Sequence, residues 1–483
     1  MTSAETAGAA AAADVTPAET AGAEAAGVEA AAPVPAEPIA RGLPGPPLRA
    51  TPKLLRLLVA DRLGMMNLAA SRYGDMARIR VGPKVLYVLN EPSLVKHVLV
   101  DNAAKYHKGI GLVQARRALG DGLLTSDGDR WAAQRKVMQP VFQAKRIAEQ
   151  ADRVAEEATA WVERLSLQAG RGVVDVTAEM TKLTLGVLGR TLLDSDLHGY
   201  AGIGHSFEAV QDQAMFEMVT LGLLPLWLPL PKQLRFRRAR RRLDEVVDAL
   251  IAERSRRGEA AGDDALGRLL ASIRTETGEV RRQRGREELT TLLLAGHETT
   301  ASTLSWAFHL LDEHPAVARR MRAEAIAVLG NRRPGYADLN RLRYTTMVVE
   351  EVMRLYPPVW ILPRSAQADD EINGHRIPAG SDVIVSPYIL HRHPRYWLDP
   401  ERFVPERFER AQASARPRYS YLPFGAGPRV CIGSNLAMME AVFVLSTVVR
   451  QLELRKLPGR PVVAEPMLSL RIRGGLPMTV HRI

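Results

Sequence analysis

The chain has 483 residues, of which 46% are hydrophobic and 25% charged, values that are ordinary for a globular protein. Its single cysteine excludes a disulfide framework and most thiolate zinc sites, and it suits a reducing compartment. The formal net charge is +11 without a zinc finger or an RNA-binding aromatic motif, so we expect an acidic protein partner rather than nucleic acid.

Residues 1–40 are dominated by alanine and contain acidic residues but no Lys, Arg, Leu, Phe or Trp. Such a stretch buries too little apolar surface to offset its ordering entropy, which predicts a disordered tail. It lacks the basic start and apolar centre of a secretory signal, and its acidic residues exclude a membrane anchor. We therefore expect a soluble, cytoplasmic protein with one catalytic domain over residues 41–483.

The next segments combine short strands with a helix. Runs at 77–81 and 85–89, separated by Gly82-Pro83, predict a β-hairpin, and the many glycines at 105–129 predict an irregular section. A helix is then expected to start at Arg130. Trp131 and Arg135 are four residues apart and share one face of this helix, which on its own could be an amphipathic surface helix.

Residues 146–290 have mostly helical patterns. The apolar stretch 221–230 is interrupted by Pro225 and Pro229, so it is too short and kinked to span a bilayer. We interpret it as a lid or entrance loop, with core packing as the alternative. The arginine-rich run 235–242 predicts a solvated helix face, with phosphate or membrane contact as the alternative.

Residues 289–311 form the longest apolar helical pattern, and polar residues within it argue against a membrane span. A helix that is apolar on all sides is expected to cross the protein interior. Small Ala295 and Gly296 at its middle would let a flat group approach. Glu298 next to Thr299 suits a proton relay, although a buried glutamate satisfied by its neighbours is the alternative.

Two helices follow, the first ending near Gly330 and the second near Tyr356, and a strand is expected at 382–385. The second helix carries Glu351 and Arg354 at a spacing that is typical of a helix salt bridge. Arg364 lies in the connection before the strand.

The only cysteine lies in the stretch Phe424-Gly-Ala-Gly-Pro-Arg-Val-Cys431-Ile-Gly433, directly before an apolar helical run. Its glycines and proline predict a tight loop. A sulfur just before a helix N-terminus is favoured as a thiolate, and a thiolate there is a nucleophile or a metal ligand. A buried structural cysteine is the alternative.

The spaced pattern Phe424-x-x-Gly427-x-Arg429-x-Cys431-x-Gly433 resembles the haem-binding loop of the cytochrome P450 superfamily. The resemblance implies a soluble, bacterial-type protein with the cytochrome P450 fold, mainly α with small β-sheets (α+β), as one large haem-binding domain. It implies heme b (iron protoporphyrin IX) as cofactor and Cys431 as the ligand of its iron. A C-terminal β-hairpin is expected after this loop.

Three further motifs match the family in its order. The Trp131 and Arg135 pair matches the helix that binds a haem propionate, and Glu298-Thr299 matches the oxygen-activating acid and alcohol. The Glu351 and Arg354 pair matches a charged triad completed by Arg407, which we expect to fix the architecture rather than to act in catalysis. The resemblance thus implies a cofactor-binding set of Trp131, Arg135, Ala295, Arg364, Phe424, Arg429, Cys431 and Gly433.

The resemblance implies a monooxygenase that uses O2 to hydroxylate or epoxidise a lipophilic small molecule. Fatty acid, terpenoid, steroid and polyketide substrates all remain open, and a role in bacterial secondary metabolism is an analogy. Electrons are expected from a ferredoxin or similar donor protein with its NAD(P)H reductase. An apolar pocket is expected from the following residues and range: Ile110, Leu112, Val113, Leu292, Ala295, 359–362, Met467 and Leu468.

Two alternative functions fit the same cofactor. A peroxide-using or isomerising haem-thiolate enzyme would need no redox partner, but loss of the Glu298-Thr299 pair would have favoured it, and the pair is present. A haem-based gas sensor would form no product under aerobic, reducing conditions.

Overall fold

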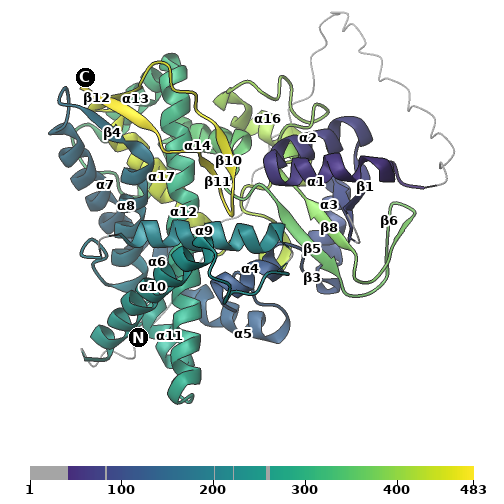
Figure 1. Cartoon of the computed structure of the whole chain (residues 1–483). Coiled ribbons are helices and arrows are strands. Elements are labelled where there is room, and N and C mark those ends of the chain that lie inside the picture. Colours follow the sequence, from purple (N-terminus) through teal and green to yellow (C-terminus); the bar gives the residue numbers. More distant parts are fainter. Residues whose placement is uncertain (1–41, 82–83, 201, 221, 257–261) are drawn as a thin grey trace, which may run out of the picture. The chain divides into compact units, whose positions relative to one another are not determined.

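The computed structural model describes residues 42–81, 84–200, 202–220, 222–256 and 262–483. The predicted tail at 1–40 and the Gly82-Pro83 turn lie outside these residues. Leu43–Ile483 forms one compact unit, in which helices predominate and the strands form several small, separate sheets (Figure 1). The predicted mainly α class with small β-sheets is therefore confirmed.

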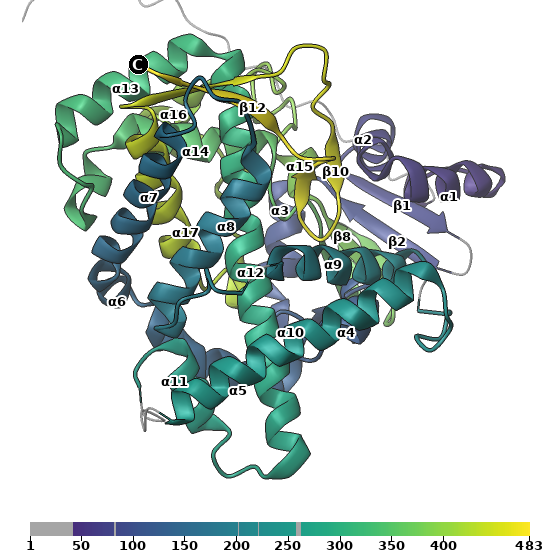
Figure 2. The same cartoon turned by 60° about the vertical axis from the view of Figure 1, so that its left-hand side comes forward.

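The helices account for most of the described chain (Figures 1 and 2). The α-helices are α1 (Thr51–Ala60), α2 (Arg62–Tyr73), α3 (Pro92–Lys96), α4 (Leu112–Leu119), α5 (Gly128–Met138), α6 (Ala144–Glu149), α7 (Ala151–Ser166), α8 (Val176–Leu188), α9 (Ile203–Val219), α10 (Pro231–Arg256), α11 (Ala265–Ser272), α12 (Gly278–Glu313), α13 (Pro315–Leu329), α14 (Arg343–Leu355), α15 (Pro387–Leu390), α16 (Arg410–Ala415) and α17 (Ser434–Val448).

The strands are short and belong to four sheets in the described chain. They are β1 (Met76–Val81), β2 (Lys84–Leu89), β3 (Tyr106–Lys108), β4 (Val173–Asp175), β5 (Leu362–Ala366), β6 (Asp370–Ile372), β7 (His375–Ile377), β8 (Asp382–Val385), β9 (Leu452–Lys456), β10 (Ala464–Pro466), β11 (Leu470–Ile472) and β12 (Pro477–Arg482). The largest sheet has the order β1-β2-β8-β5-β3, with β2 and β8 parallel and the other neighbours antiparallel.

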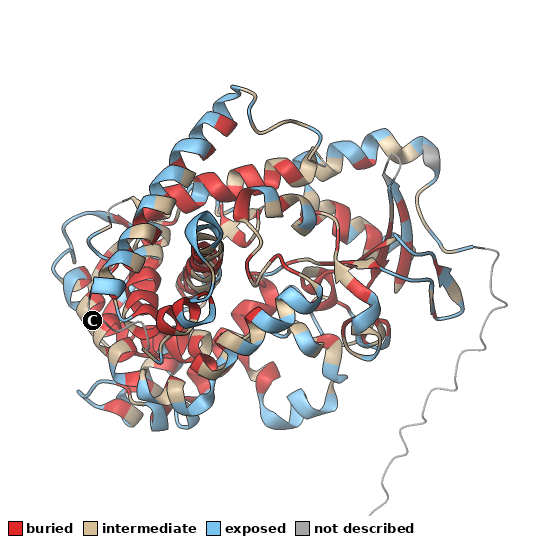
Figure 3. Ribbon diagram, turned by 90° about the horizontal axis from the view of Figure 1, so that it is seen from below, coloured by how far each residue is buried: buried red, intermediate tan, exposed pale blue. Residues whose placement is uncertain are grey.

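Helix α12 runs through the core, as the apolar pattern predicts. It packs against α8, α10, α14 and α17, and Figure 2 shows it passing among them. From Ala301 to Leu311 every residue is buried, and Figure 3 shows that buried residues concentrate along the inner helices. A helix in this position can present side chains from its middle to an internal site while its neighbours exclude water.

Several elements lie within a few residues of their predicted places. They are the hairpin of β1 and β2, strand β8, and the helices at Pro315–Leu329 and Arg343–Leu355. A C-terminal hairpin also follows the cysteine loop, where β9 pairs with β12. The prediction of an irregular section at 105–129 is wrong in part, because α4 lies inside it. The glycines there flank the helix: Gly111 precedes its first residue and Gly120 ends it with φ 85°.

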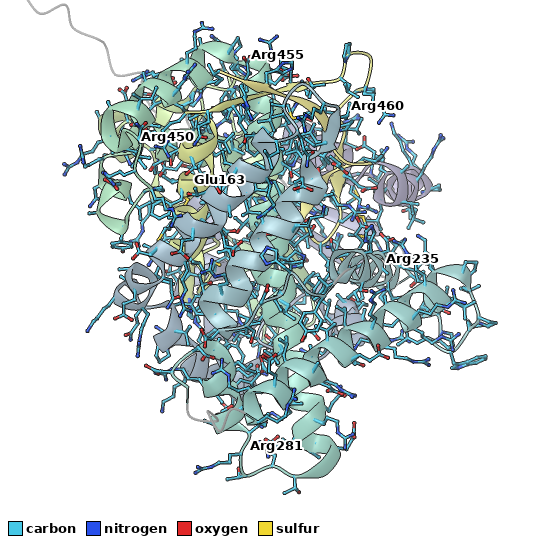
Figure 4. All side chains as sticks on the ribbon, turned by 90° about the vertical axis from the view of Figure 1, so that its left-hand side faces the viewer. Glu163, Arg235, Arg281, Arg450, Arg455 and Arg460 are labelled. Carbon is cyan, nitrogen blue, oxygen red and sulfur yellow. The ribbon has the colours of Figure 1, made fainter. Side chains whose placement is uncertain are left out.

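Two other local predictions need correction. Arg364 lies in strand β5 rather than in a connection, because its backbone pairs with β8 and β3. Helix α5 begins at Gly128, two residues before the predicted start. In the connection between α9 and α10, Leu223 is 79% exposed and Trp227 is 72% exposed, so these side chains are not part of the core. The arginines of α10 are mainly exposed, and Arg235, labelled in Figure 4, pairs with Asp212 of α9 at 2.8 Å.

Candidate haem-thiolate site

The loop that carries Cys431 has a backbone that only glycine permits at one position. The Cys431 N–H donates to the carbonyl of Phe424 at 2.9 Å, which closes the loop. Gly427 has φ +70°, and a Cβ at this residue would lie 1.8 Å from the carbonyl oxygen of Leu99. The glycine therefore lets the loop lie directly against the Leu99 backbone, and this contact fixes where the sulfur lies.

The Cys431 thiol lies in a recess of the protein. The residue is exposed, yet the surrounding protein desolvates the sulfur enough to raise the pKa of the thiol. A group is both accessible and desolvated when it lines a concave surface. The N–H of Gly433 and the charge of Arg135 lower this pKa but do not outweigh burial. The Gly433 N–H at the start of α17 thus acts in the expected direction, toward the thiolate, while burial acts against it. A bound cation would add to the first effect.

Helix α5 brings Trp131 and Arg135 to the cysteine loop. The Arg135 Nη1 donates to the carbonyl of Val430 at 2.8 Å. The Arg429 guanidinium lies 4.3 Å from the centroid of the Trp131 ring, in a cation–π contact. Both predicted residues of α5 thus contact the loop, one through its backbone and one through the Arg429 side chain.

Three cations gather beside this loop around one carboxylate. Arg429 Nη2 donates to Asp127 Oδ1 at 2.6 Å, and Lys108 pairs with Arg364 across the β3–β5 ladder. Burial and the charge of Arg429 lower the pKa of Arg364 to about 10, and burial together with Arg364 lowers the pKa of Lys108 well below its ordinary value. The Lys108 backbone N–H also donates to Asp127 Oδ1 at 3.1 Å, but among the described residues no salt bridge joins the Lys108 ammonium or the Arg364 guanidinium to a carboxylate. The cluster has more positive charge than the protein around it neutralises.

A dicarboxylate would satisfy this surplus of charge. Buried cations without a counter-ion are destabilising unless a partner is supplied. Haem has two propionates and an iron that takes a thiolate ligand, so the Cys431 sulfur and the neighbouring cations together fit that cofactor. Sequence reasoning missed Lys108. In the sequence, only the position of Lys108 just before Gly109 could have drawn attention to it. Its pairing with Arg364 depends on the tertiary structure.

The middle of α12 presents Ala295 outward. It is the exposed residue in a helical stretch, 288–311, that is otherwise buried or half-buried. Gly296 points elsewhere: a Cβ there would lie 2.1 Å from Leu188 of α8, so this glycine serves helix packing rather than access for a flat group. Thr299 donates its hydroxyl to the Ala295 carbonyl at 3.0 Å, and α12 remains continuous through this turn.

Glu298 is held by the turn between β10 and β11. Its Oε1 accepts a hydrogen bond of 2.7 Å from the Ser469 hydroxyl, and its Oε2 lies 3.9 Å from His297 Nε2. Burial lowers the pKa of His297, so this ring is neutral at pH 7. Ser469 was not predicted, since nothing in the sequence connects it with residue 298.

The predicted charged triad is present and buried. Arg354 donates to both Glu351 oxygens, at 2.6 and 2.8 Å, and Arg407 Nε lies 3.4 Å from Glu351 Oε1. Glu351 and Arg354 have no exposed side-chain surface. The triad lies at α14 and the segment Pro405–Phe408, where it joins elements far apart in the sequence.

The predicted apolar pocket residues have mixed surroundings. Ile110 and Leu292 are partly buried against hydrophobic clusters, and Met467 is buried. Val113 and Val359 are exposed by 45% and 36%. These mixed exposures agree with residues that line a recess.

Comparison with protein families matches residues 44–474 to the family described as Cytochrome P450. The chain is 38% identical over 422 residues to Cyclooctatin synthase of Streptomyces melanosporofaciens, which covers 86% of this chain and 90% of that protein. It is 37% identical over 391 residues to Cyclooctat-9-en-7-ol 5-monooxygenase of the same organism, covering 80% and 84%. It is 32% identical over 384 residues to Pentalenene oxygenase of Streptomyces avermitilis, covering 79% and 84%. Within the described residues, no helix is both long and apolar enough to cross a membrane.

Proposed function

The chain belongs to the cytochrome P450 family and is a haem-thiolate monooxygenase, and from this premise we propose the role of each site residue. The family binds heme b and inserts one atom of O2 into a C–H bond. Two electrons and two protons balance the reaction, and the second oxygen atom leaves as water. The chain therefore has to hold the cofactor, exclude water, deliver protons and receive electrons from a redox partner.

Cys431 is the proposed ligand of the haem iron. When bound, the haem supplies the metal that activates O2, and sulfur ligation favours cleavage of the O–O bond. The N–H of Gly433 and the Arg135 charge both act on this sulfur and moderate its basicity. Trp131, Arg135, Arg364, Arg429 and the newly identified Lys108 would hold the propionates. The surplus of buried positive charge beside Cys431 is the observation that carries this assignment.

The experiment that tests the assignment is replacement of the sulfur. Cys431→Ser should remove the carbon monoxide difference band that is typical of a thiolate ligand, because a hydroxyl cannot replace the thiolate at this iron. Circular dichroism should show that the variant still folds, since a serine hydroxyl is close in size to the thiol and can still accept from the Gly433 N–H. An unchanged band in the variant would contradict the role of Cys431.

Glu298 and Thr299 are the proposed proton relay. The Ser469 hydroxyl donates to Glu298 and holds the carboxylate in place. The Thr299 hydroxyl donates to the Ala295 carbonyl, and its oxygen can accept a hydrogen bond from another donor. The relay holds protons at these two oxygens for transfer toward the exposed side of α12 at Ala295. Glu298 was predicted as a buried group, and 16% of its side chain is accessible, which permits exchange of protons with water.

Thr299→Ala tests the relay separately from cofactor binding. The variant should bind haem and substrate normally, but product formed per electron should fall about tenfold or more as electrons are diverted to peroxide. Thr300→Ala is the matched control, because Thr300 is the next hydroxyl on α12 and is itself buried. Turnover supported by peroxide and not by a reductase system would instead favour a peroxide-using enzyme.

The proposed substrate is a cyclic terpenoid. The names of two relatives, Cyclooctat-9-en-7-ol 5-monooxygenase and Pentalenene oxygenase, refer to terpene skeletons. The organisms of these relatives support a place in bacterial secondary metabolism. Fatty acids, steroids and polyketides have no comparable support.

The proposed electron donor is a ferredoxin with its NAD(P)H reductase, in the cytoplasm. Lys136 of α5 and Lys145 of α6 are exposed on helices near the cysteine loop, and the basic formal charge of +11 would attract an acidic carrier. A single cysteine suits the reducing cytoplasm.

A further inference from the structure

A cavity of about 230 Å³ lies between two segments near the C-terminus: the end of β9 with the loop after it, and the connection between β11 and β12. Its lining includes three cations, Lys456, Arg460 and Arg473, and two glycines, Gly474 and Gly475. The other lining residues are leucine, valine and proline, so no carboxylate of the described chain lines the cavity. None of these residues is assigned above to the haem or to the proton relay.

Arg460 has no counter-ion among the described residues. It is exposed on the loop after β9, where it is labelled in Figure 4, and neither an ion pair nor a hydrogen bond joins its side chain to another described residue. A single arginine of this kind would simply be solvated. Here, however, it faces the same cavity as two further cations, and their positive charges add up within a small volume.

Arg473 shares its carboxylate with other guanidinium groups. Its Nε lies 3.7 Å from Glu465 Oε1, whereas Arg471 Nε donates to Glu465 Oε2 at 2.9 Å and Arg471 Nη2 also lies 3.7 Å from Asp212. Burial and, to a smaller extent, the charge of Arg473 lower the pKa of Arg62, which Glu465 offsets only in part. Glu465 therefore serves three guanidinium groups, and Arg473 has the longest of its contacts to lose.

Lys456 fixes one wall of the cavity to α12. Its Nζ donates to Glu313 at 2.7 Å and lies 3.7 Å from Asp312, so its own charge is largely neutralised. The surplus charge on the cavity wall is therefore that of the two guanidinium groups. Its neighbour Arg455 points to the opposite face of β9, does not line the cavity and pairs with Glu453 at 3.1 Å.

The connection after β11 adds backbone donors to these cations. Gly474 and Gly475 have φ values of 73° and 84°, in the region that favours glycine. Neither N–H has a backbone acceptor among the described residues, and a Cβ at Gly474 would meet nothing within 4 Å. Uncovered N–H groups in a turn are typical of anion-binding concavities.

The size of the cavity restricts the ligand. A volume of about 230 Å³ corresponds to the space of about seven or eight water molecules, which is below the range of about 300–1,000 Å³ for drug-sized ligands. A nucleotide or a terpenoid is therefore too large. Guanidinium groups match the oxygens of phosphoryl groups in a bidentate manner, and two of them on facing segments match two phosphoryl groups.

We propose that this cavity binds a small anion with two phosphoryl groups, either free diphosphate or the diphosphate end of a small ester, between Arg460 and Arg473. The anion would accept hydrogen bonds from both guanidinium groups and from the N–H groups of the glycine turn. It would supply the negative charge that Glu465 alone does not provide. The inference does not depend on the proposed function, because none of the residues that carry it belongs to the haem site.

Occupation of the site would stabilise the packing of the C-terminal strands on α12. Lys456 joins one wall of the cavity to the end of this helix, and β11 follows Ser469, whose hydroxyl holds Glu298. An anion that joins the loop after β9 to the connection after β11 would restrain both segments. We therefore expect binding to raise the thermal stability of the whole chain.

Calorimetry of the haem-loaded full chain in about 0.15 M NaCl, which screens diffuse attraction, tests the site. Inorganic diphosphate should bind about tenfold more tightly than malonate, a small dicarboxylate, because it carries more charge and more acceptor oxygens. Arg460→Gln and Arg473→Gln should each weaken diphosphate binding about tenfold. Arg455→Gln, which removes an exposed cation outside the cavity, is the matched control and should change the affinity less than about twofold.

Isopentenyl diphosphate separates the two sources of the ligand. If it binds as tightly as diphosphate, the terminal diphosphate group of an ester is recognised; if only inorganic diphosphate binds, the free anion is the ligand. Both results support the site.

Thermal unfolding gives a second readout. Diphosphate at about a hundredfold excess over its dissociation constant should raise the melting temperature of the wild type and of Arg455→Gln by about 2–4 °C, but not that of the double variant Arg460→Gln/Arg473→Gln. A wild type that does not bind diphosphate, equal affinity for malonate, or an equal loss of binding in Arg455→Gln would each overturn the inference. The thiolate-type carbon monoxide band should be the same in all these variants, so the proposed function is tested separately.

Discussion

Arg354, in the network behind the cysteine loop, and Gln211, in the helix that extends from α12 toward α4, are both fully buried, but their surroundings are opposite. The Arg354 guanidinium donates to Glu351 and to the carbonyls of His391, Pro400 and Arg402. Gln211 has no partner for either polar atom. The difference teaches that a buried polar group with complete partners fixes architecture, whereas one without partners carries a desolvation cost that nothing in the protein offsets.

The largest expected effect removes the partner of Arg354. Glu351→Gln should lower the free energy of unfolding by about 3–5 kcal/mol, because it leaves a buried guanidinium without its counter-ion. Glu351 also accepts from the N–H of Val404 at 2.9 Å, so the loop before Arg407 should loosen as well. Urea unfolding of the purified variant measures the loss.

The matched control for this change is an exposed ion pair. Glu453 contacts Arg455 at 3.1 Å within β9, where both side chains are about half exposed. Glu453→Gln should cost less than about 1 kcal/mol. If the two substitutions had similar effects, burial would not be what makes the Arg354 network architectural, and the comparison would lose its basis.

Glu288 of α12 is intermediate between the two cases. Its Oε2 accepts from the Leu123 N–H at 3.2 Å, while its Oε1 has no partner. Burial raises the pKa of Glu288 from 4.5 to about 7, and the Leu123 N–H, Arg130, Arg284 and Gln134 lower it only in part. Its sequence neighbour Glu287 pairs with Arg130 Nη2 at 3.1 Å.

The raised pKa predicts how stability depends on pH. Between pH 4.5 and 7 the folded protein binds a proton that the unfolded chain has lost, so Glu288 makes the free energy of unfolding fall as pH rises. At about 1.4 kcal/mol for each pKa unit, the loss is on the order of 3 kcal/mol above pH 7. Glu288→Gln should therefore stabilise the protein at pH 8 and have little effect at pH 4.5. Urea unfolding at both pH values checks this, and an equal effect at the two would contradict the titration of Glu288.

Most helices of the fold could be predicted because each has a local signal. The apolar pattern of α12, the spacing of Glu351 and Arg354 in α14 and the glycines around Cys431 all act within a few residues. The structure of the region near Lys108 was harder to predict. The glycines around α4 favoured an irregular segment, although Gly111 and Gly120 lie at the ends of the helix.

The site could be predicted only where a residue belongs to a spaced motif. Trp131, Arg135 and Arg429 meet at the loop as the resemblance implies. Lys108 faces Arg364 because two strands pair across more than 250 positions of sequence, and Ser469 reaches Glu298 from the C-terminal region. The lack of partners at Gln211 is likewise a property of the packed structure, since its sequence neighbours alone do not exclude a distant partner.

Lys108 gives the smallest expected effect and tests whether the comparison extends to charges. Like Gln211 it lacks a full partner in the protein, so it should matter for the cofactor more than for the fold. Lys108→Met removes the charge and keeps the length of the side chain; loss of one charged contact to a propionate should speed haem release about tenfold, or about 1.4 kcal/mol. Transfer of haem to apomyoglobin measures this rate, with Lys136→Met, an exposed change on α5, as control.

The free energy of unfolding of the haem-free variant should stay equal or rise, because a desolvated ammonium has been removed. An unchanged rate of haem release together with a less stable haem-free protein would show that Lys108 supports the fold, and the surplus charge beside Cys431 would then not be a binding device.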